Sequence, residues 1–236
     1  PYGWHYKPFV TTAKQMLDDG AVGDIEFVQC HMASPTKTFF SGWGGVPKET
    51  APTLVAPDPK TWQVPAHGGG YAHGQLTHST ALMFWLTRLR ATEVRAIATS
   101  PGSAVDMYDA ATVTFANGAI GVVSGAATLP DNDKFQVDLR IFGSQGCLLI
   151  DVERERLELR RHDGGNRSVA VSPGEGAYSC DVPPARFIDL IQGISTYNQS
   201  PVDVGARSVE LLEALQRSAA AGGRAERIDL SLGRGY

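Results

Sequence analysis

The stretch from residue 93 to residue 172 alternates apolar and polar residues, and this pattern constrains the fold most. At 135–141 every second residue is apolar, and Asn117-Gly118 separates two further runs at 113–115 and 120–123. An Asn-Gly pair between such runs predicts a tight hairpin. The alternation indicates antiparallel strands with one packed face and one face that is wet or at an interface. The expected strands are residues 93–100, 105–116, 119–129, 134–143, 147–153, 156–161 and 168–172.

Helical patterns flank this block on both sides. Residues 8–19 predict a helix, because Pro8 suits a first turn and Gly20 suits a stop. A strand is expected at 24–34, followed by a helix at 75–89 whose centre is apolar all round and should be buried. Helices at 185–194 and 205–223 and a last strand at 227–230 complete the pattern. One block of strands with helices at both ends indicates an α+β fold, with a large, mostly antiparallel sheet and helices packed on one face.

The bulk composition excludes several classes of protein. The chain has 236 residues, of which 42% are hydrophobic, and we expect a single domain over residues 1–236. The net charge of −4 does not indicate the basic surface that binds nucleic acid or an anionic membrane. No apolar run approaches the roughly 20 residues of a membrane span. Cys30, Cys147 and Cys180 lack metal or disulfide spacing, so reduced thiols and a cytoplasmic location are expected.

Residues 34–67 form a proline-rich segment without a clear period. A long irregular loop of this kind is uncommon in a compact domain and is often functional. An equally good interpretation is a surface loop that its aromatic side chains hold in place. Trp43 and Trp62 are suited to stacking on the face of a sugar, or to anchoring the loop.

The stretch GGGYAHGQLTHS, residues 68–79, brings several polar groups to the start of the predicted buried helix. It contains no G-x-G-x-x-G motif after a strand, so a dinucleotide or phosphate loop is not expected. On an α-helix, His73 and His78 would be about 140° apart, so we expect no metal site. A neutral imidazole at His78 suits the acceptance of a hydroxyl proton. A structural role as a helix cap is the alternative from the pattern alone.

Five segments in order resemble the C-terminal domain of the Gfo/Idh/MocA oxidoreductases, the glucose–fructose oxidoreductase and inositol dehydrogenase group. They are KPFVTTAKQMLDDGAVGDIEFV, GGGYAHGQLTHSTALMFWL, YDAATVTFANGAIGVVSG, IFGSQGCLLID and SVELLEALQRSAAAGGRAERIDL. The resemblance covers nearly the whole chain. It implies a preceding Rossmann domain that binds NAD or NADP and is absent from this chain, which begins at Pro1. We therefore expect a piece of a longer protein, with no cofactor-binding residue here.

The resemblance also implies roles for individual residues. The family's histidine at the start of the buried helix corresponds to His78, which is expected to be catalytic. The family's aspartate four residues earlier corresponds to Gly74, and a family arginine falls near His5. Substrate contacts are expected from His5, His73, Gln75, Trp43 and Trp62. Tyr6-Lys7-Pro8 mimics the family's catalytic E-K-P motif, but it runs directly into sequence of the C-terminal domain and is not taken as that motif.

The function expected from this resemblance is substrate binding and oligomerisation within an NAD(P)-dependent dehydrogenase of a sugar, polyol or related hydroxy compound. The isolated chain should then be inactive, and the open face of the sheet should pair with another subunit. The alternative is a carbohydrate-binding or assembly module that has lost the hydride chemistry, because Gly74 replaces the expected carboxylate. A cofactor-assisted glycoside hydrolase on the same scaffold lacks a supporting pair of carboxylates in the sequence.

Overall fold

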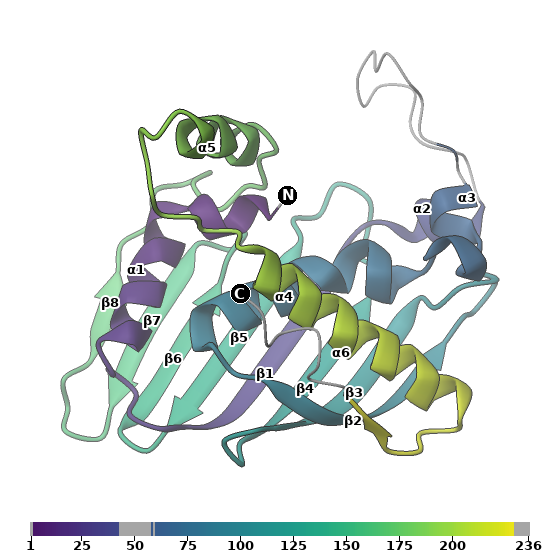
Figure 1. Cartoon of the computed structure of the whole chain (residues 1–236), viewed down its shortest axis with the longest axis horizontal. Coiled ribbons are helices and arrows are strands. Elements are labelled where there is room, and N and C mark those ends of the chain that lie inside the picture. Colours follow the sequence, from purple (N-terminus) through teal and green to yellow (C-terminus); the bar gives the residue numbers. More distant parts are fainter. Residues whose placement is uncertain (1, 43–57, 59, 229–236) are drawn as a thin grey trace.

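A computed structural model describes residues 2–42, 58 and 60–228 (Figure 1). Its strands are β1 (Ile25–Ala33), β2 (Ala91–Thr99), β3 (Tyr108–Phe115), β4 (Ile120–Ala126), β5 (Gln136–Gly143), β6 (Gly146–Asp151), β7 (Arg156–Arg161), β8 (Arg167–Val169) and β9 (Glu226–Arg227). The α-helices are α1 (Pro8–Asp18), α2 (Lys37–Ser41), α3 (Lys60–Gln63), α4 (Thr77–Thr87), α5 (Val182–Ile191) and α6 (Val202–Ala220). Three short turns join them: the 3₁₀ turns η1 (Gly3–Tyr6) and η2 (Pro65–His67), and the π-helical turn η3 (Ala72–Leu76).

The strands form one nine-stranded sheet in the order β8-β7-β6-β5-β1-β4-β3-β2-β9. Every pairing is antiparallel except that of β1 with β4, where Cys30 pairs with Val123. The hairpin expected at Asn117-Gly118 joins β3 to β4, and Gly118 has a φ of +89° that favours glycine. The α+β class and the mostly antiparallel sheet are therefore confirmed.

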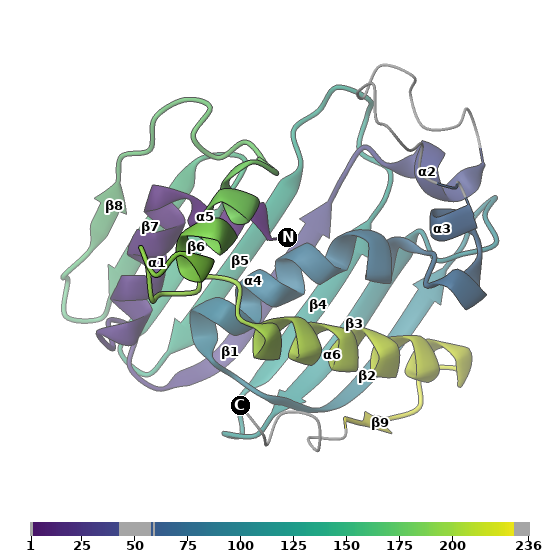
Figure 2. The same cartoon turned by 45° about the horizontal axis from the view of Figure 1, so that its top comes forward.

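The helices α1, α4 and α6 cover one face of this sheet, as Figures 1 and 2 show. Residues Ser79–Thr87 of α4 are all buried, as expected for a helix that is apolar on every side. A short hydrogen bond joins the hydroxyls of Thr80 and Ser208 and fastens α4 to α6. Ser218 of α6 accepts a hydrogen bond from the backbone N–H of Ala96 in β2, at 2.8 Å. These polar contacts fix the helix layer against the sheet.

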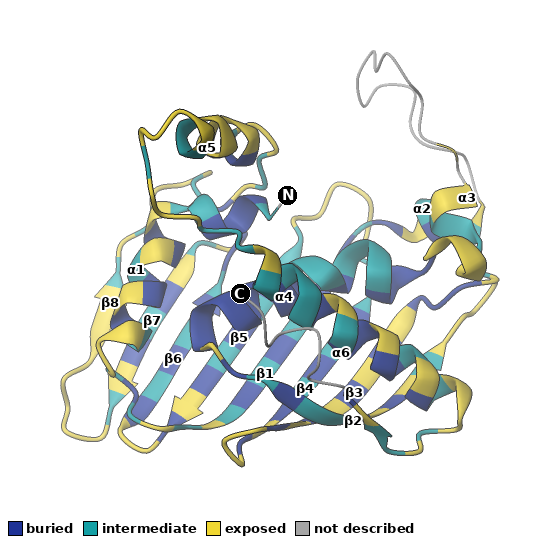
Figure 3. Cartoon of the chain, in the orientation of Figure 1, coloured by how far each residue is buried: buried dark blue, intermediate teal, exposed yellow. Residues whose placement is uncertain are grey.

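Among the residues that the structure describes, no helix covers the other face of the sheet in Figures 1 and 2. Along β3 the residues alternate strictly between exposed and buried, which matches the period of two in the sequence. Figure 3 shows this alternation as stripes along the strands. Two large apolar side chains point out of this open face: Ile97 is 67% exposed and Ile120 is 57% exposed.

Three local expectations differ from the structure. In place of the helix expected at 75–89, the π-helical turn η3 (Ala72–Leu76) leads directly into α4 (Thr77–Thr87), so helical backbone begins at Ala72. The helix expected at 185–194 begins and ends earlier, because α5 spans Val182–Ile191. Of the strand expected at 227–230, Arg227 lies in β9, whereas residues 229 and 230 lie outside the described part of the chain.

Candidate functional site

The chain enters α4 through the π-helical turn η3, and Asp106 fastens this entrance. Its Oδ2 accepts a hydrogen bond from the N–H of Ala72 at 2.7 Å, and its backbone oxygen accepts one from Tyr71 at 3.0 Å. Gly70 has a φ of +112°, and a side chain there would collide with the Asp106 carboxylate. The glycines thus bring the loop close to the buried helix. Single π turns within helices are rare and occur frequently at functional sites.

His78 lies in the first turn of α4 and is half-buried. Its ring contacts three aromatic rings edge-on: Tyr178 at 5.4 Å, Trp4 at 5.8 Å and Tyr2 at 6.0 Å between centroids. Its Nδ1 is buried and has no hydrogen-bond partner among the described residues. Burial lowers the pKa of His78 to about 4, so the imidazole is neutral at pH 7. A neutral ring with a free nitrogen can accept a hydroxyl hydrogen bond.

His5 is fully buried on η1. Its Nδ1 lies 2.7 Å from the carbonyl oxygen of Gln199. Because a carbonyl only accepts, Nδ1 must carry the proton and Nε2 must carry the lone pair. This Nε2 is also buried without a partner among the described residues. Burial lowers the pKa of His5 to about 4. The ring stacks on Trp85 at 4.9 Å, which confirms Trp85 as a core residue.

Tyr2 brings the two imidazoles into one site. Its ring stacks on His5, with centroids 5.3 Å apart, and meets His78 edge-on. Its hydroxyl lies 3.4 Å from Oγ1 of Thr77, beside His78 on α4. We call Tyr2, His5, His78 and Tyr178 the imidazole cluster. The structure therefore places two of the predicted site residues, His5 and His78, around one aromatic ring.

The remaining predicted residues that the structure describes lie outside the imidazole cluster. His73 and Gln75 are half-buried on η3, before the imidazole cluster. Trp62 of α3 stacks on Phe39 at 5.8 Å, and α3 lies far from α1 and the N-terminus in Figures 1 and 2. Trp43 lies outside the described residues. Substrate contacts by these side chains remain predictions.

Gly74 is covered by aromatic rings. A Cβ atom at this position would lie 3.0 Å from two ring carbons of Phe40 and 3.7 Å from Cδ1 of Trp62. Phe40 is itself buried. The space in which the family's aspartate would extend is therefore occupied by a hydrocarbon ring in this chain.

Two carboxyl groups, Asp106 and Asp109, meet beneath the start of η3. Burial, with a smaller contribution from the neighbouring Asp106, raises the pKa of Asp109 to about 9. Neither carboxyl oxygen of Asp109 has a partner among the described residues. Gln216 of α6 donates to Asp106 Oδ1 at 2.8 Å. Both aspartates are buried, and Asp106 is held by Ala72 and Gln216, so we assign the pair to the support of η3.

No cluster of three or more His, Cys, Asp or Glu side chains that could hold a metal ion occurs within the described ranges. In the glycine turn, Gly69 packs against the backbone oxygens of Trp62 and Val64, and Gly70 packs against the side chain of Asp106. These acceptor oxygens do not suit a pyrophosphate. All three cysteines are free. Across residues 2–42, 58 and 60–228, no helix has the length and apolarity needed to cross a bilayer.

Sequence reasoning missed several residues of the site. Tyr2, Trp4 and Tyr178 surround His78. The carbonyl oxygen of Gln199 fixes the tautomer of His5, because it accepts a hydrogen bond from Nδ1–H. Trp4 adjoins a predicted residue, but no local pattern connects residue 178 or 199 to residue 78. These contacts arise only when the loops on either side of α5 return to the start of the chain.

The fold and the site define an α+β domain, with an open sheet on one side and a buried imidazole site beneath its helices. Residues 10–149 match the model of the GFO/IDH/MocA C-terminal domain, and the chain belongs to this family. A comparison with curated proteins finds no match.

Solved structures share the fold over nearly the whole chain. An oxidoreductase described as putative, from Thermotoga maritima, is 19% identical, with a TM-score of 0.72 over 96% of this chain and 62% of its own. An NAD-binding oxidoreductase from Klebsiella pneumoniae is 20% identical, with a TM-score of 0.71 over 97% of this chain and 65% of its own. A levoglucosan dehydrogenase in its apo form is 19% identical, with a TM-score of 0.70 and the same two coverages, 97% and 65%. The chain thus spans 62 to 65% of the length of these proteins.

Proposed function

We propose that this chain is the substrate-binding and oligomer-forming part of an NAD(P)-dependent oxidoreductase that acts on a sugar, polyol or related hydroxy compound. The observation that carries the proposal is the imidazole cluster. His5 and His78 are both neutral at pH 7, and each has a buried ring nitrogen without a partner among the described residues. Such nitrogens match the hydroxyl hydrogens of a polyhydroxy substrate. The name of the similar levoglucosan dehydrogenase supports a sugar-type substrate.

His78 is the catalytic residue in this proposal. It would accept the hydrogen bond of the reacting hydroxyl and take its proton, while the oxidised dinucleotide held by the other domain would take the hydride from the same carbon. A pKa of about 4 keeps His78 unprotonated at pH 7 but makes it a weak base, so orientation of the hydroxyl is the larger part of its role. His73 and Gln75 on η3 are proposed to hydrogen-bond other hydroxyls, and Trp62 to border the sugar.

The dinucleotide belongs to another domain of the same polypeptide in this proposal. The glycine turn at Gly70 is proposed not to hold its pyrophosphate, because Asp106 lies against Gly70. The similar Klebsiella pneumoniae protein is described as NAD-binding and is longer than this chain, which supports a separate NAD or NADP domain. The 236-residue chain alone is then expected to show no turnover.

A homo-oligomer through the open sheet face is the proposed assembly. Exposed Ile97 and Ile120 make an apolar surface that a second subunit would cover. We propose no nucleic-acid or membrane partner, in keeping with the net charge of −4. The three free cysteines favour the reducing cytoplasm.

The alternative is a carbohydrate-binding or assembly module without hydride chemistry. The specific observation in its favour is the Phe40 ring over Gly74, which leaves no room for a carboxylate. Binding of NAD and NADP to the whole polypeptide, measured by calorimetry, separates the two proposals. Binding of neither dinucleotide would favour the module.

Substitution of His78 tests the role of the imidazole cluster. In the whole polypeptide, His78→Ala should lower kcat/KM by about 100-fold or more, the usual contribution of a positioned acid–base group. Dinucleotide affinity should stay unchanged. His67→Ala, at an exposed histidine of η2, is the matched control. Wild-type turnover by His78→Ala would remove His78 from the mechanism.

A further inference from the structure

Glu153 carries a buried carboxyl group in the turn between β6 and β7, and it is only 7% exposed. Its Oε1 accepts a hydrogen bond from the N–H of Tyr178 at 3.1 Å, and its Oε2 accepts one from the N–H of Phe135 at 3.2 Å. Neither donor lies in a strand or a helix. Because a buried polar group is stable only when it is hydrogen-bonded, these two bonds connect Glu153 firmly to two irregular segments of the chain.

The rings of the two donors enclose Trp4. Tyr178 meets Trp4 edge-on, with ring centroids 4.8 Å apart, and Phe135 meets it edge-on at 6.1 Å. Tyr178 and Trp4 in turn contact the imidazole of His78, at 5.4 Å and 5.8 Å. We call Trp4, Phe135 and Tyr178 the aromatic wall. It lies between the carboxyl group of Glu153 and His78 in the chain of contacts.

The loop at residues 172–181 lies directly on the backbone of its neighbours. A Cβ atom at Gly176 would lie 2.1 Å from the backbone oxygen of Val152, in the turn after β6. A Cβ atom at Gly3 of η1 would lie 2.2 Å from the backbone oxygen of Ser179. Both distances are far below van der Waals contact, so only glycine allows these approaches. The loop therefore contacts both the turn that carries the carboxyl group and the start of the chain.

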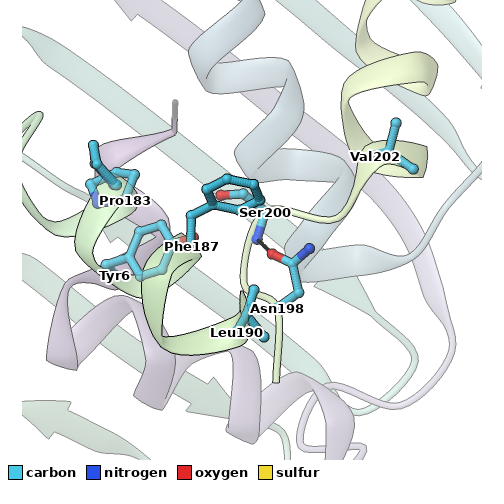
Figure 4. Close-up of a pocket in the computed structure, with 8 residues that line it drawn as sticks. Tyr6, Pro183, Phe187, Leu190, Asn198, Ser200 and Val202 are labelled. Atoms are coloured by element: carbon cyan, nitrogen blue, oxygen red, sulfur yellow. Dashed lines mark hydrogen bonds between the residues drawn. The ribbon is translucent and has the colours of Figure 1, made fainter. Parts of the chain in front are cut away.

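The opposite side of η1, towards α5, is incompletely packed. A groove of about 510 Å³ opens there, and Tyr6 of η1, Leu190 of α5 and Asn198 line it (Figure 4). Of the ten residues of α5 only Pro183 is buried. The position of η1, and with it the position of Trp4, therefore depends on the contacts that the aromatic wall provides.

We infer that Glu153 is a positioning residue that holds the aromatic wall against His78. The inference rests on the proposed function, because it bears on catalysis only if His78 acts on a substrate. Burial lowers the pKa of His78 to about 4, and Trp4 and Tyr178 contribute to that burial. A displaced wall would admit water to the imidazole, and its pKa would rise towards 6.5.

The neighbouring titratable groups allow a packing effect to be separated from an electrostatic one. Lys134 is the cation that acts on Glu153. The titratable side chains around His78 are Tyr2, His5 and Tyr178. Removal of a negative charge at Glu153 would lower the pKa of His78, whereas exposure of the imidazole would raise it. The two effects therefore have opposite signs.

Glu153→Gln in the whole polypeptide tests the inference. The amide keeps the shape of the carboxyl group, but its NH₂ faces a donor N–H, so one of the two hydrogen bonds is lost. NMR titration of isotope-labelled histidine should show the pKa of His78 rise from about 4 to about 5 or above. The signal is assigned from its absence in His78→Gln. An unchanged or lowered pKa would overturn the inference.

Glu155→Gln is the matched control. Glu155 lies in the same turn, and its Oε1 also accepts a hydrogen bond from the loop at 172–181, from the N–H of Gly174 at 2.6 Å. Gly174 lies outside the aromatic wall, so the pKa of His78 should stay at about 4. An equal rise in both variants would show a general loosening of the loop and would overturn the specific role of Glu153.

Hydrogen exchange of the wild-type protein provides a second measurement, which does not require a variant to fold. The amides of Phe135 and Tyr178 lie outside regular structure, but each donates to the buried carboxyl group. Both should therefore exchange at least about 10-fold more slowly than unprotected amides. Unprotected exchange of both amides would overturn the inference.

Calorimetry with NAD and NADP on the same proteins separates this inference from the proposed function. Dinucleotide binding with an unchanged pKa of His78 in Glu153→Gln would overturn the inference and leave the proposed function standing. A raised pKa in a polypeptide that binds neither dinucleotide would support the positioning role of Glu153 and overturn the proposed dehydrogenase function.

Discussion

The ring of Phe40 lies where a side chain at position 74 would extend. The closest ring carbons are 3.0 Å from the position of a Cβ atom, closer than ordinary van der Waals contact. Phe40 is buried and meets Tyr71 edge-on at 5.9 Å, so it cannot move away freely. Gly74 is therefore part of an aromatic packing arrangement, and any larger side chain at this position must displace Phe40.

This relationship predicts opposite effects for two Gly→Ala substitutions in helical turns. Gly74→Ala should destabilise the protein by about 1 kcal/mol or more, because overpacking displaces Phe40. Gly205→Ala, where the added atom meets only the Tyr2 hydroxyl at 3.7 Å, should be neutral or stabilising by about 0.5–1 kcal/mol. Urea unfolding measures both. Equal effects would contradict the proposed crowding at Gly74.

The raised pKa of Asp109 predicts that the free energy of unfolding falls as pH rises. Burial raises the folded-state pKa to about 9, whereas the unfolded carboxyl releases its proton near its ordinary value of 3.8. Between these pH values the folded state binds more protons, so the free energy of unfolding decreases with pH. Asp109→Asn removes this penalty and should be more stable than wild type at pH 8, by about 1 kcal/mol or more. The difference should shrink towards pH 4.5 in urea unfolding. A constant difference would show that Asp109 is ionised.

His78 predicts the opposite dependence in the acid range. Burial lowers its pKa from 6.5 to about 4, so only the unfolded state is protonated between these values. Stability is therefore present above pH 6.5 and is lost as pH falls towards 4. His78→Gln should reduce the loss between pH 7 and 4.5 by about 2 kcal/mol, after allowance for partial exposure. NMR titration of the ring should place its pKa below 5, and a value near 6.5 would refute its burial as a neutral group.

The open sheet face predicts how the protein assembles. Ile97→Asp together with Ile120→Asp should weaken self-association by about 30-fold or more, because a central apolar contact contributes about 2 kcal/mol. Light scattering across micromolar concentrations measures the change in mass. Val209→Asp adds one negative charge at an exposed apolar residue of α6 and should not change the mass. A wild-type protein that is already a monomer would rule out this interface.

Local patterns predicted much of the fold. The alternation at 135–141 matches β5, whose Val137, Leu139 and Ile141 are buried, and the apolar run of α4 is buried throughout. Both predictions succeed because side-chain direction along a strand or helix depends only on neighbours in the chain. The π turn before His78 was not predicted, since it depends on Asp106 holding the turn from another part of the fold.

The sequence by itself determined the strands, the buried helix, the Asn117-Gly118 turn and the position of His78 at a helix start. Tertiary structure alone decided that β1 lies between β5 and β4, that Tyr2 joins His5 to His78, and that Phe40 covers Gly74. The reason is physical. Periodicity reports which way a side chain points, whereas its partner depends on packing between segments far apart in the chain.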